Sequence, residues 1–276
     1  MRKIKLTKAQ IKRECKKLLQ LNLQNISLKE LKQKINNILI NSWTNIIGRA
    51  DKYEIIRARK GKFNNIKELW YPPKELINSF GRLNDKQEQI FYCSFGHNAS
   101  LGSLEEIKVK KGDYVTQIFS DLLSDKSYKL CGLGNIEEWM KEKDNKIKKL
   151  YEYNELDLKH KIGIKEFNKN KFIRDCLNKV FIKKVKYEYE YKYKLSIAIA
   201  HLYFEKFEMK GILYPSVATN KKSVNLALRP QVADQFIKFK YARIIKILDI
   251  TDDGYKLKLK NEAYDIDEKG NFKWLY

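Results

Sequence analysis

Residues 89–120, QIFYCSFGHNASLGSLEEIKVKKGDYVTQIFS, decide the fold. The first seven of them combine aromatic and β-branched side chains, which favour a strand. Residues 99–108 then have the pattern of a short helix, KKGD at 110–113 predicts a turn, and YVTQIFS predicts a second strand. A strand, a helix and a strand in such a short stretch indicate an α+β fold, in which a helix lies against a sheet.

Further strands are predicted on both sides of this stretch. YEIIRAR (53–59) precedes it, and Pro72-Pro73 interrupts regular structure between the two. Residues 134–205 have a helical and highly charged pattern. The predicted strands that follow are separated by turn residues: GILYPSV (211–217), VNLALR (224–229), YARIIKILDI (241–250), YKLKLK (255–260) and FKWLY (272–276). The expected architecture is α+β, with a mixed or antiparallel sheet, a helical insertion and an N-terminal helical extension.

Residues 1–50 form the predicted helical extension. Its second helix opens at a capping box, Ser27-x-x-Glu30, which is followed by apolar residues at helical spacing. Such an apolar stripe either packs on the following domain or contacts a partner, and packing is the commoner outcome. Residues 51–276 form the main predicted domain, with a lysine-rich helical insertion around 134–185.

The net charge of +23 indicates either a polyanionic partner, such as nucleic acid, or a compositional drift toward lysine. Only nine of the 57 basic residues are arginine. Because lysine mostly occupies solvated faces, we interpret most of the charge as drift. Each arginine is then informative, since lysine is poorly suited to planar, bidentate recognition of anions.

The cysteines and the hydropathy of the chain favour a folded protein of the cytoplasm. The four cysteines, at positions 15, 93, 131 and 176, form no C-x-x-C pair, so we expect them to be reduced and structural. No stretch approaches the roughly 20 apolar residues of a membrane helix, and the basic N-terminus lacks the apolar core of a signal peptide. The sequence has no zinc, P-loop, GxGxxG or G-x-S-x-G signature, so we expect no metal and no serine-triad chemistry.

Five short polar motifs lie beside apolar strands. They are RAR (57–59), GRLN (81–84), FYCS (91–94), LEEI (104–107) and YPSV (214–217). Each is weak alone, but in this order they resemble the RES domain. Its members carry an arginine on an early strand, a G-R-x-N segment, a strand with a tyrosine, an A-L-x-E-aliphatic helix and a late Y-x-S strand. The resemblance spans residues 53–228 and leaves residues 1–50 and the lysine-rich region largely unmatched.

The resemblance implies a fold similar to ADP-ribosyltransferases and the consumption of NAD⁺ by hydrolysis, phosphorolysis or ADP-ribosyl transfer. NAD⁺ is then the substrate, and the bond that breaks joins nicotinamide to ribose. Many members are toxins that a cognate antitoxin protein holds inactive. The implied protein is an intracellular toxin or stress effector of the cytoplasm, with NAD⁺ and an antitoxin as partners and no membrane contact.

Glu106 aligns with the glutamate of the family. Cleavage of the nicotinamide–ribose bond develops positive charge on the ribose, which a nearby carboxylate stabilises. The adjacent Glu105 points about 100° away on a helix, so only one of the two should face the site. Without the resemblance, both would be ordinary exposed helix residues.

Four further residues receive roles from the same resemblance. Arg82 is a predicted clamp for the pyrophosphate or the ribose, and Arg57 is a second predicted anion clamp. Tyr92 is expected to stack on the nicotinamide ring, and Ser216 to hydrogen-bond the nicotinamide amide, the catalytic carboxylate or nearby backbone. The structural alternatives are a solvated arginine face, a core tyrosine and a strand-end serine. We expect all five residues to line one concave pocket.

The alternative function is a basic nucleic-acid-binding module without NAD⁺ activity. KYEYEYKYK (186–194) places a tyrosine at every second position among charges, which on a strand would offer a platform for stacking bases. As the start of a helix, the same run would scatter these rings. Binding to nucleic acid would weaken steeply with salt.

Overall fold

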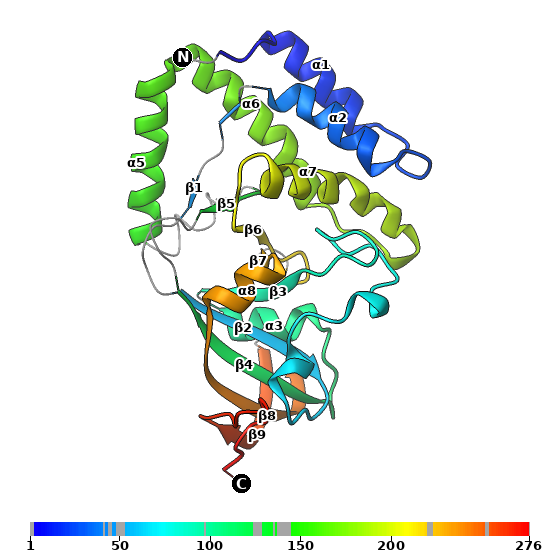
Figure 1. Cartoon of the computed structure of the whole chain (residues 1–276), viewed down its shortest axis with the longest axis vertical. Helices are drawn as coiled ribbons and strands as arrows, with labels where there is room; N and C mark the ends of the chain where they lie inside the picture. The colour runs from blue at the N-terminus through cyan, green and yellow to red at the C-terminus, as the bar shows by residue number, and fades with distance from the viewer. Residues whose placement is uncertain are drawn as a thin grey trace. The chain divides into compact units, whose positions relative to one another are not determined.

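The computed structural model shows an α+β protein with mixed strand pairing (Figure 1). The described residues are 3–40, 42–43, 46–47, 53–96, 98–123, 129–134, 136, 145–219, 223–251 and 254–275. The chain divides into two compact units. The helical unit comprises residues 1–49, 74–88 and 127–215, and the sheet unit comprises residues 50–73, 89–126 and 216–276. The predicted α+β class is confirmed.

The helical unit is built mainly from paired helices. They are α1 (Lys8–Leu19), α2 (Leu28–Leu39), α5 (Asn145–Ile162), α6 (Ile164–Phe181) and α7 (Lys194–Glu205), with the 3-10 segments η2 (Lys74–Leu76) and η3 (Tyr187–Tyr193). α1 packs on α6, and α2 packs on α7 (Figure 1). The predicted apolar stripe of α2 is buried, with Leu31 and Ile35 at 0% exposure, so the stripe serves packing.

The helical unit also contains three short strands. They are β1 (Ile46–Ile47), β5 (Leu130–Gly132) and β6 (Gly211–Pro215). β5 pairs parallel with β6 and antiparallel with β1. Residues 1–49 therefore belong to the same unit as the lysine-rich helices of the predicted insertion. Residues 135 and 137–144 of that insertion lie outside the described residues.

The sheet unit is an antiparallel sheet with a helix on one face. Its strands lie in the order β7-β3-β2-β4-β8-β9, and each neighbouring pair is antiparallel. The strands are β2 (Tyr53–Lys60), β3 (Phe91–Phe95), β4 (Tyr114–Leu122), β7 (Val224–Leu228), β8 (Ile237–Thr251) and β9 (Gly254–Ala263). The other elements are α3 (Ala99–Glu106), η1 (Ile66–Leu69) and α8 (Pro230–Phe236).

Strand alternation gives the two faces of this sheet different partners. Ile56 and Phe119, which are cross-strand partners, pack with Ala99 of α3 on one face. Ile118 points to the other face, where it forms a cluster with Leu69 of η1 and residues near the C-terminus. Helix α3 thus covers only one side of the sheet, and the candidate site is on that side.

The structure decides between the two alternatives for the tyrosine run and corrects one predicted strand. The run adopts the 3-10 segment η3, which leads directly into α7, so the helix-start alternative is confirmed and no strand platform forms. In FKWLY, Phe272 makes only an isolated bridge to Ile266, and Lys273–Leu275 are not in a strand. Phe272 instead packs into the cluster around Leu69, because burial of the ring does not require continued pairing.

The helix N-termini confirm part of the predicted capping chemistry. Ser27 Oγ accepts a hydrogen bond from the Glu30 amide (3.1 Å), while the Glu30 carboxylate lies 3.4 Å from Lys34. A complete capping box occurs instead at α1, where Thr7 and Gln10 bond to each other's backbone amides. These caps satisfy amides that the first helical turn leaves unpaired.

We expect Ser27→Ala to lower the free energy of unfolding by about 1 kcal/mol, because the Glu30 amide loses its acceptor. Ser27→Asp, which keeps an acceptor at the N-cap, serves as the control and should stay close to the parent. Chemical denaturation followed by circular dichroism measures both. An alanine variant as stable as the parent would show that the cap contributes nothing.

Candidate active site

Helix α3 follows β3 through a turn that only certain residues tolerate. Gly96 (φ 68°) and Asn98 (φ 64°) both adopt the left-handed backbone, which glycine adopts freely and asparagine tolerates better than most residues. The turn lays α3 across the sheet and buries Ala99 and Leu104 against it. The helix ends at Glu106, the predicted catalytic carboxylate.

A buried polar network holds α3 on the sheet. Arg243 of β8 donates hydrogen bonds to Gln117 Oε1 on β4 (2.9 Å) and to Ser100 Oγ on α3 (2.9 Å). Gln117 Nε2 donates to Ser103 Oγ (2.7 Å). Burial lowers the pKa of Arg243, whose guanidinium also lies over the Phe119 ring. Because buried polar groups must find hydrogen-bond partners, this network fixes the position of α3 on the sheet.

Gly102 allows α3 to approach the strands closely. A methyl group at this position would lie 2.5 Å from Ser223 Oγ and 3.2 Å from Ser94 Oγ, which is too close for packed atoms. Gly102 precedes Glu106 by four residues, so both lie on the same face of the helix. The close approach therefore sets the depth at which Glu106 meets β7.

Glu106 is anchored through one carboxylate oxygen. Its Oε1 accepts hydrogen bonds from Ser216 Oγ (2.6 Å) and from Asn225 Nδ2 (2.6 Å). Among the described residues, Oε2 has no hydrogen-bond partner, and Glu106 is an exposed residue. Short bonds to a charged acceptor are strong and orient it. The arrangement leaves one fixed carboxylate oxygen available to a ligand.

Ser216 is a buried positioning residue. Its hydroxyl donates to Glu106 and accepts a hydrogen bond from the Thr219 amide (3.1 Å). Its amide donates to the Ser223 carbonyl oxygen (2.9 Å), and it is 0% exposed. Because this buried hydroxyl both donates and accepts within the protein, it orients Glu106 and the turn at Thr219, which is one of the hydrogen-bonding roles predicted for it.

Asn225 is a site residue that the sequence did not single out. It lies on β7 at 5% exposure, and its Oδ1 has no hydrogen-bond partner among the described residues. Its orientation follows from Glu106, because a carboxylate only accepts and so faces the amide nitrogen. The usable signal was an asparagine within the apolar run VNLAL, since a polar side chain in a buried strand must have a partner.

Glu105 points away from this cluster, as predicted from helix geometry. It faces Tyr255 of β9, where burial, together with a hydrogen bond to the Glu105 carboxylate, raises the pKa of the Tyr255 hydroxyl. The two adjacent glutamates therefore contact different strands, and only Glu106 reaches Ser216 and Asn225.

Arg57 lies on the opposite face of the sheet, which corrects its predicted position beside Glu106. Its guanidinium donates to the carbonyl oxygens of Tyr92 and Trp70 and lies over the Phe91 ring. Burial lowers its pKa to about 10. On a strand, odd and even positions face opposite sides, and the sequence alone does not say which side α3 covers. Arg57 fastens backbone segments together there.

Tyr92 shares a face with Asn225. It lies opposite Ala227 of β7, while Ser94 lies opposite Asn225, and side chains two residues apart along a strand point the same way. Tyr92 is half-buried. This placement is compatible with the predicted stacking role, which stays a prediction.

Arg82 belongs to the helical unit, and the contacts described below lie within that unit. Its Nη1 donates to the carbonyl oxygens of Phe181 (3.1 Å) and Lys183 (3.3 Å), beyond the end of α6. The guanidinium lies over the Tyr193 ring, and its own carbonyl oxygen accepts from Ser196 Oγ (2.6 Å). The role of Arg82 as an anion clamp stays a prediction.

Comparisons with known proteins add no family assignment: neither the protein-family models nor the curated protein sequences contain a match to this chain. Across the described residues, no group of three or more histidine, cysteine or acidic side chains has the arrangement of a metal site. None of the described helices combines the length and the apolar character needed to cross a membrane. The four cysteines are buried thiols.

We expect Gly102→Ala to lower the free energy of unfolding by about 1–3 kcal/mol, although alanine favours helices, because the methyl group collides with Ser223. Leu101→Ala, on the exposed side of α3, is the control and should have a smaller effect. Thermal or chemical denaturation measures both. If Gly102→Ala is more stable than the parent, α3 does not sit as closely as described.

Proposed function

We propose that this chain cleaves NAD⁺ at the nicotinamide–ribose bond, with Glu106 as the catalytic carboxylate. The observation that carries the proposal is the anchoring of Glu106 Oε1 by Ser216 and Asn225, with Oε2 left without a partner among the described residues. Two donors on one oxygen fix the orientation of the carboxylate before substrate binds. Preorganised charge of this kind is most effective where charge develops in the transition state.

The chemistry requires little beyond this carboxylate. As the bond between ribose C1′ and the nicotinamide nitrogen breaks, its electron pair leaves with nicotinamide, which becomes neutral, and positive charge spreads over C1′ and the ring oxygen. Glu106 Oε2 stabilises that charge. In hydrolysis, a water oxygen then bonds to C1′ and its proton is released, so the products are nicotinamide and ADP-ribose. Phosphate or a macromolecular nucleophile would replace water in the alternative reactions.

Asn225 is proposed to have two tasks. Its Nδ2 holds Glu106, and its buried Oδ1 accepts a hydrogen bond from a substrate hydroxyl or from the nicotinamide amide. An unpaired buried acceptor costs free energy, which a substrate donor would recover. Tyr92, on the same face of the sheet, is proposed to stack on the nicotinamide ring, and Arg82 to bind the pyrophosphate.

The broader proposal is a RES-domain protein with an ADP-ribosyltransferase-like core that acts as a cytoplasmic toxin or stress effector. It is supported by the ordered motifs that contain Glu106 and Ser216, two residues that lie in contact although 110 positions separate them. A protein that consumes NAD⁺ endangers its own cell, so the proposal includes an antitoxin that blocks the site. The exposed positive charge would suit an acidic antitoxin surface.

We expect Glu106→Gln to reduce turnover by about 10²–10³-fold while NAD⁺ still binds, by analogy with the loss of one preorganised electrostatic group. Release of free nicotinamide measures turnover. Glu105→Gln is the matched control, and it should change turnover by less than about threefold, because this carboxylate contacts Tyr255 of β9 and not Ser216 or Asn225. If Glu105→Gln is inactive and Glu106→Gln is active, the catalytic carboxylate is Glu105 and the proposal for Glu106 is wrong.

We expect Asn225→Ala to reduce kcat by about tenfold or more, because Glu106 loses one of its two anchoring donors. Asn225→Asp should move the pH–rate profile to higher pH, since two adjacent carboxylates resist ionising together. Steady-state kinetics over a range of pH values measure both variants. If Asn225→Asp lowers activity equally at every pH, Asn225 has a purely structural role.

A further inference from the structure

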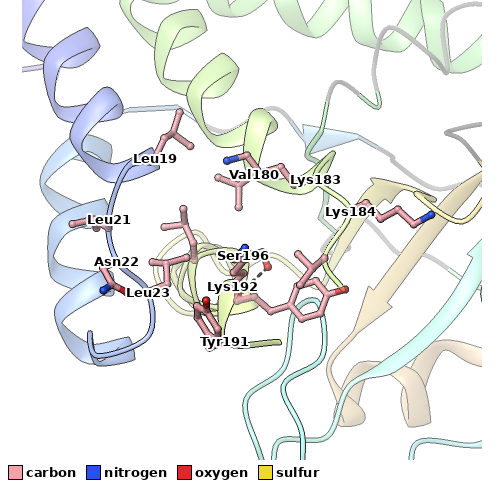
Figure 2. Close-up of a pocket in the computed structure, with 13 residues that line it drawn as sticks. Leu19, Leu21, Asn22, Leu23, Val180, Lys183, Lys184, Tyr191, Lys192 and Ser196 are labelled. Atoms are coloured by element: carbon pink, nitrogen blue, oxygen red, sulfur yellow. Dashed lines mark hydrogen bonds between the residues drawn. The ribbon is translucent and has the colours of Figure 1, made fainter. Parts of the chain in front are cut away.

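A cavity of about 460 Å³ opens in the helical unit (Figure 2). Its volume falls within the range of about 300–1,000 Å³ typical of small-molecule sites. The residues that line it belong to the helical unit, so none of them is Glu106, Ser216 or Asn225.

One wall of the cavity is apolar. Leu19 at the end of α1 and Leu21 and Leu23 of the following loop line it on one side (Figure 2). Val180 of α6 and Leu195 of α7, both buried, complete this surface. Such a surface favours a ligand with an apolar or aromatic body.

The charged part of the lining is basic. Lys183, Lys184 and Lys192 are exposed and line the cavity, and none of the described residues that line it is acidic. No acidic side chain among the described residues forms an ion pair with any of the three. Lysine is a common phosphate ligand that acts as a point charge, so this charge suits an anionic group at the rim.

The backbone that carries these lysines is fixed in place. Arg82 donates to the carbonyl oxygen of Lys183 and lies over the Tyr193 ring, which itself lines the cavity. Ser196 Oγ donates to the Arg82 and Tyr193 carbonyl oxygens (2.6 and 3.0 Å). These bonds connect the segment after α6 to the start of α7, so the cavity wall is ordered before any ligand binds.

Polar groups within the apolar wall narrow the choice of ligand. Tyr191 and Tyr193 line the cavity, and Asn22 lies among the leucines (Figure 2). Asn22 Oδ1 accepts from the Gln24 amide, which leaves its amide nitrogen as a donor. An acyl chain would leave such groups unpaired, whereas a nucleobase stacks on aromatic rings and hydrogen-bonds through its edge.

We propose that this cavity binds a nucleoside monophosphate, with the base against the leucine and tyrosine wall and the phosphate beside the lysines. The test is calorimetric titration of the full chain with AMP, GMP and UMP. We expect saturable binding of at least one nucleotide to one site. Lys183→Glu/Lys192→Glu should weaken it by about tenfold or more, since bonds to charged groups are the strong ones.

The matched control is Lys29→Glu/Lys171→Glu, which changes the net charge equally at exposed lysines of α2 and α6 that do not line the cavity. It should leave affinity within about twofold of the parent, because solvent and salt screen distant charges. Tyr191→Ala should weaken binding by about fivefold or more through lost stacking. Equal weakening in the control and cavity variants would overturn the proposal, as would no binding of any of the three nucleotides.

Two further titrations test the chemical class. Inorganic phosphate and dodecanoate should each bind more weakly than the best nucleotide, since each supplies only part of the matched chemistry. Tighter binding of dodecanoate would identify an acyl site and overturn the proposal. If NAD⁺ displaces the nucleotide and its binding is weakened equally by the Lys183 and Lys192 substitutions, the cavity is a site for NAD⁺. That result would also contradict the proposal. Nicotinamide release is a separate measurement, so either proposal can fail alone.

Discussion

The close seating of α3 on one face of the sheet is the contact on which the candidate site depends. Gly102 brings the helix within contact of Ser94 and Ser223, and the Arg243–Gln117 network fixes its position along the strands. Burying an arginine is costly unless its hydrogen bonds are satisfied, so the network tolerates few alternative seats. The position of Glu106 at the last turn follows from these contacts.

Some polar groups around Glu106 are satisfied within the protein, and others are left to bind a ligand. Ser216 is satisfied by Glu106 and Thr219, so it holds the carboxylate and the turn that follows it. Asn225 keeps one buried oxygen without a described partner, and Glu106 keeps one such carboxylate oxygen in an exposed residue. A buried acceptor without a partner is uncommon in folded proteins, and a substrate donor would satisfy the Asn225 oxygen. The exposed Glu106 oxygen is accessible to the same substrate, and these two oxygens are the physical basis for the proposed reaction.

The sequence predicts much of the fold because its strands and helices have clear periodicity. The strands from 53, 89, 114 and 224 and the helix from 99 lie where their patterns indicate. The positions of Glu106 and Ser216 could be predicted from the ordered motifs. Helix geometry alone predicted that Glu105 and Glu106 point in different directions. The face of the sheet on which Arg57 lies could not be predicted, because strand alternation says which residues share a face but not which face the helix covers. Asn225 carries no motif, and the tyrosine run fits strand and helix equally well.

The most direct test of the central claim is to incubate the purified full chain with NAD⁺, with and without phosphate, and to quantify free nicotinamide. We expect nicotinamide to accumulate over many turnovers, with ADP-ribose or a phosphorylated ADP-ribose as the second product. Supplying a cell extract as a source of macromolecular acceptors completes the measurement. NAD⁺ recovered intact under all three conditions would contradict the assignment of Glu106 as the carboxylate of an NAD⁺-cleaving site.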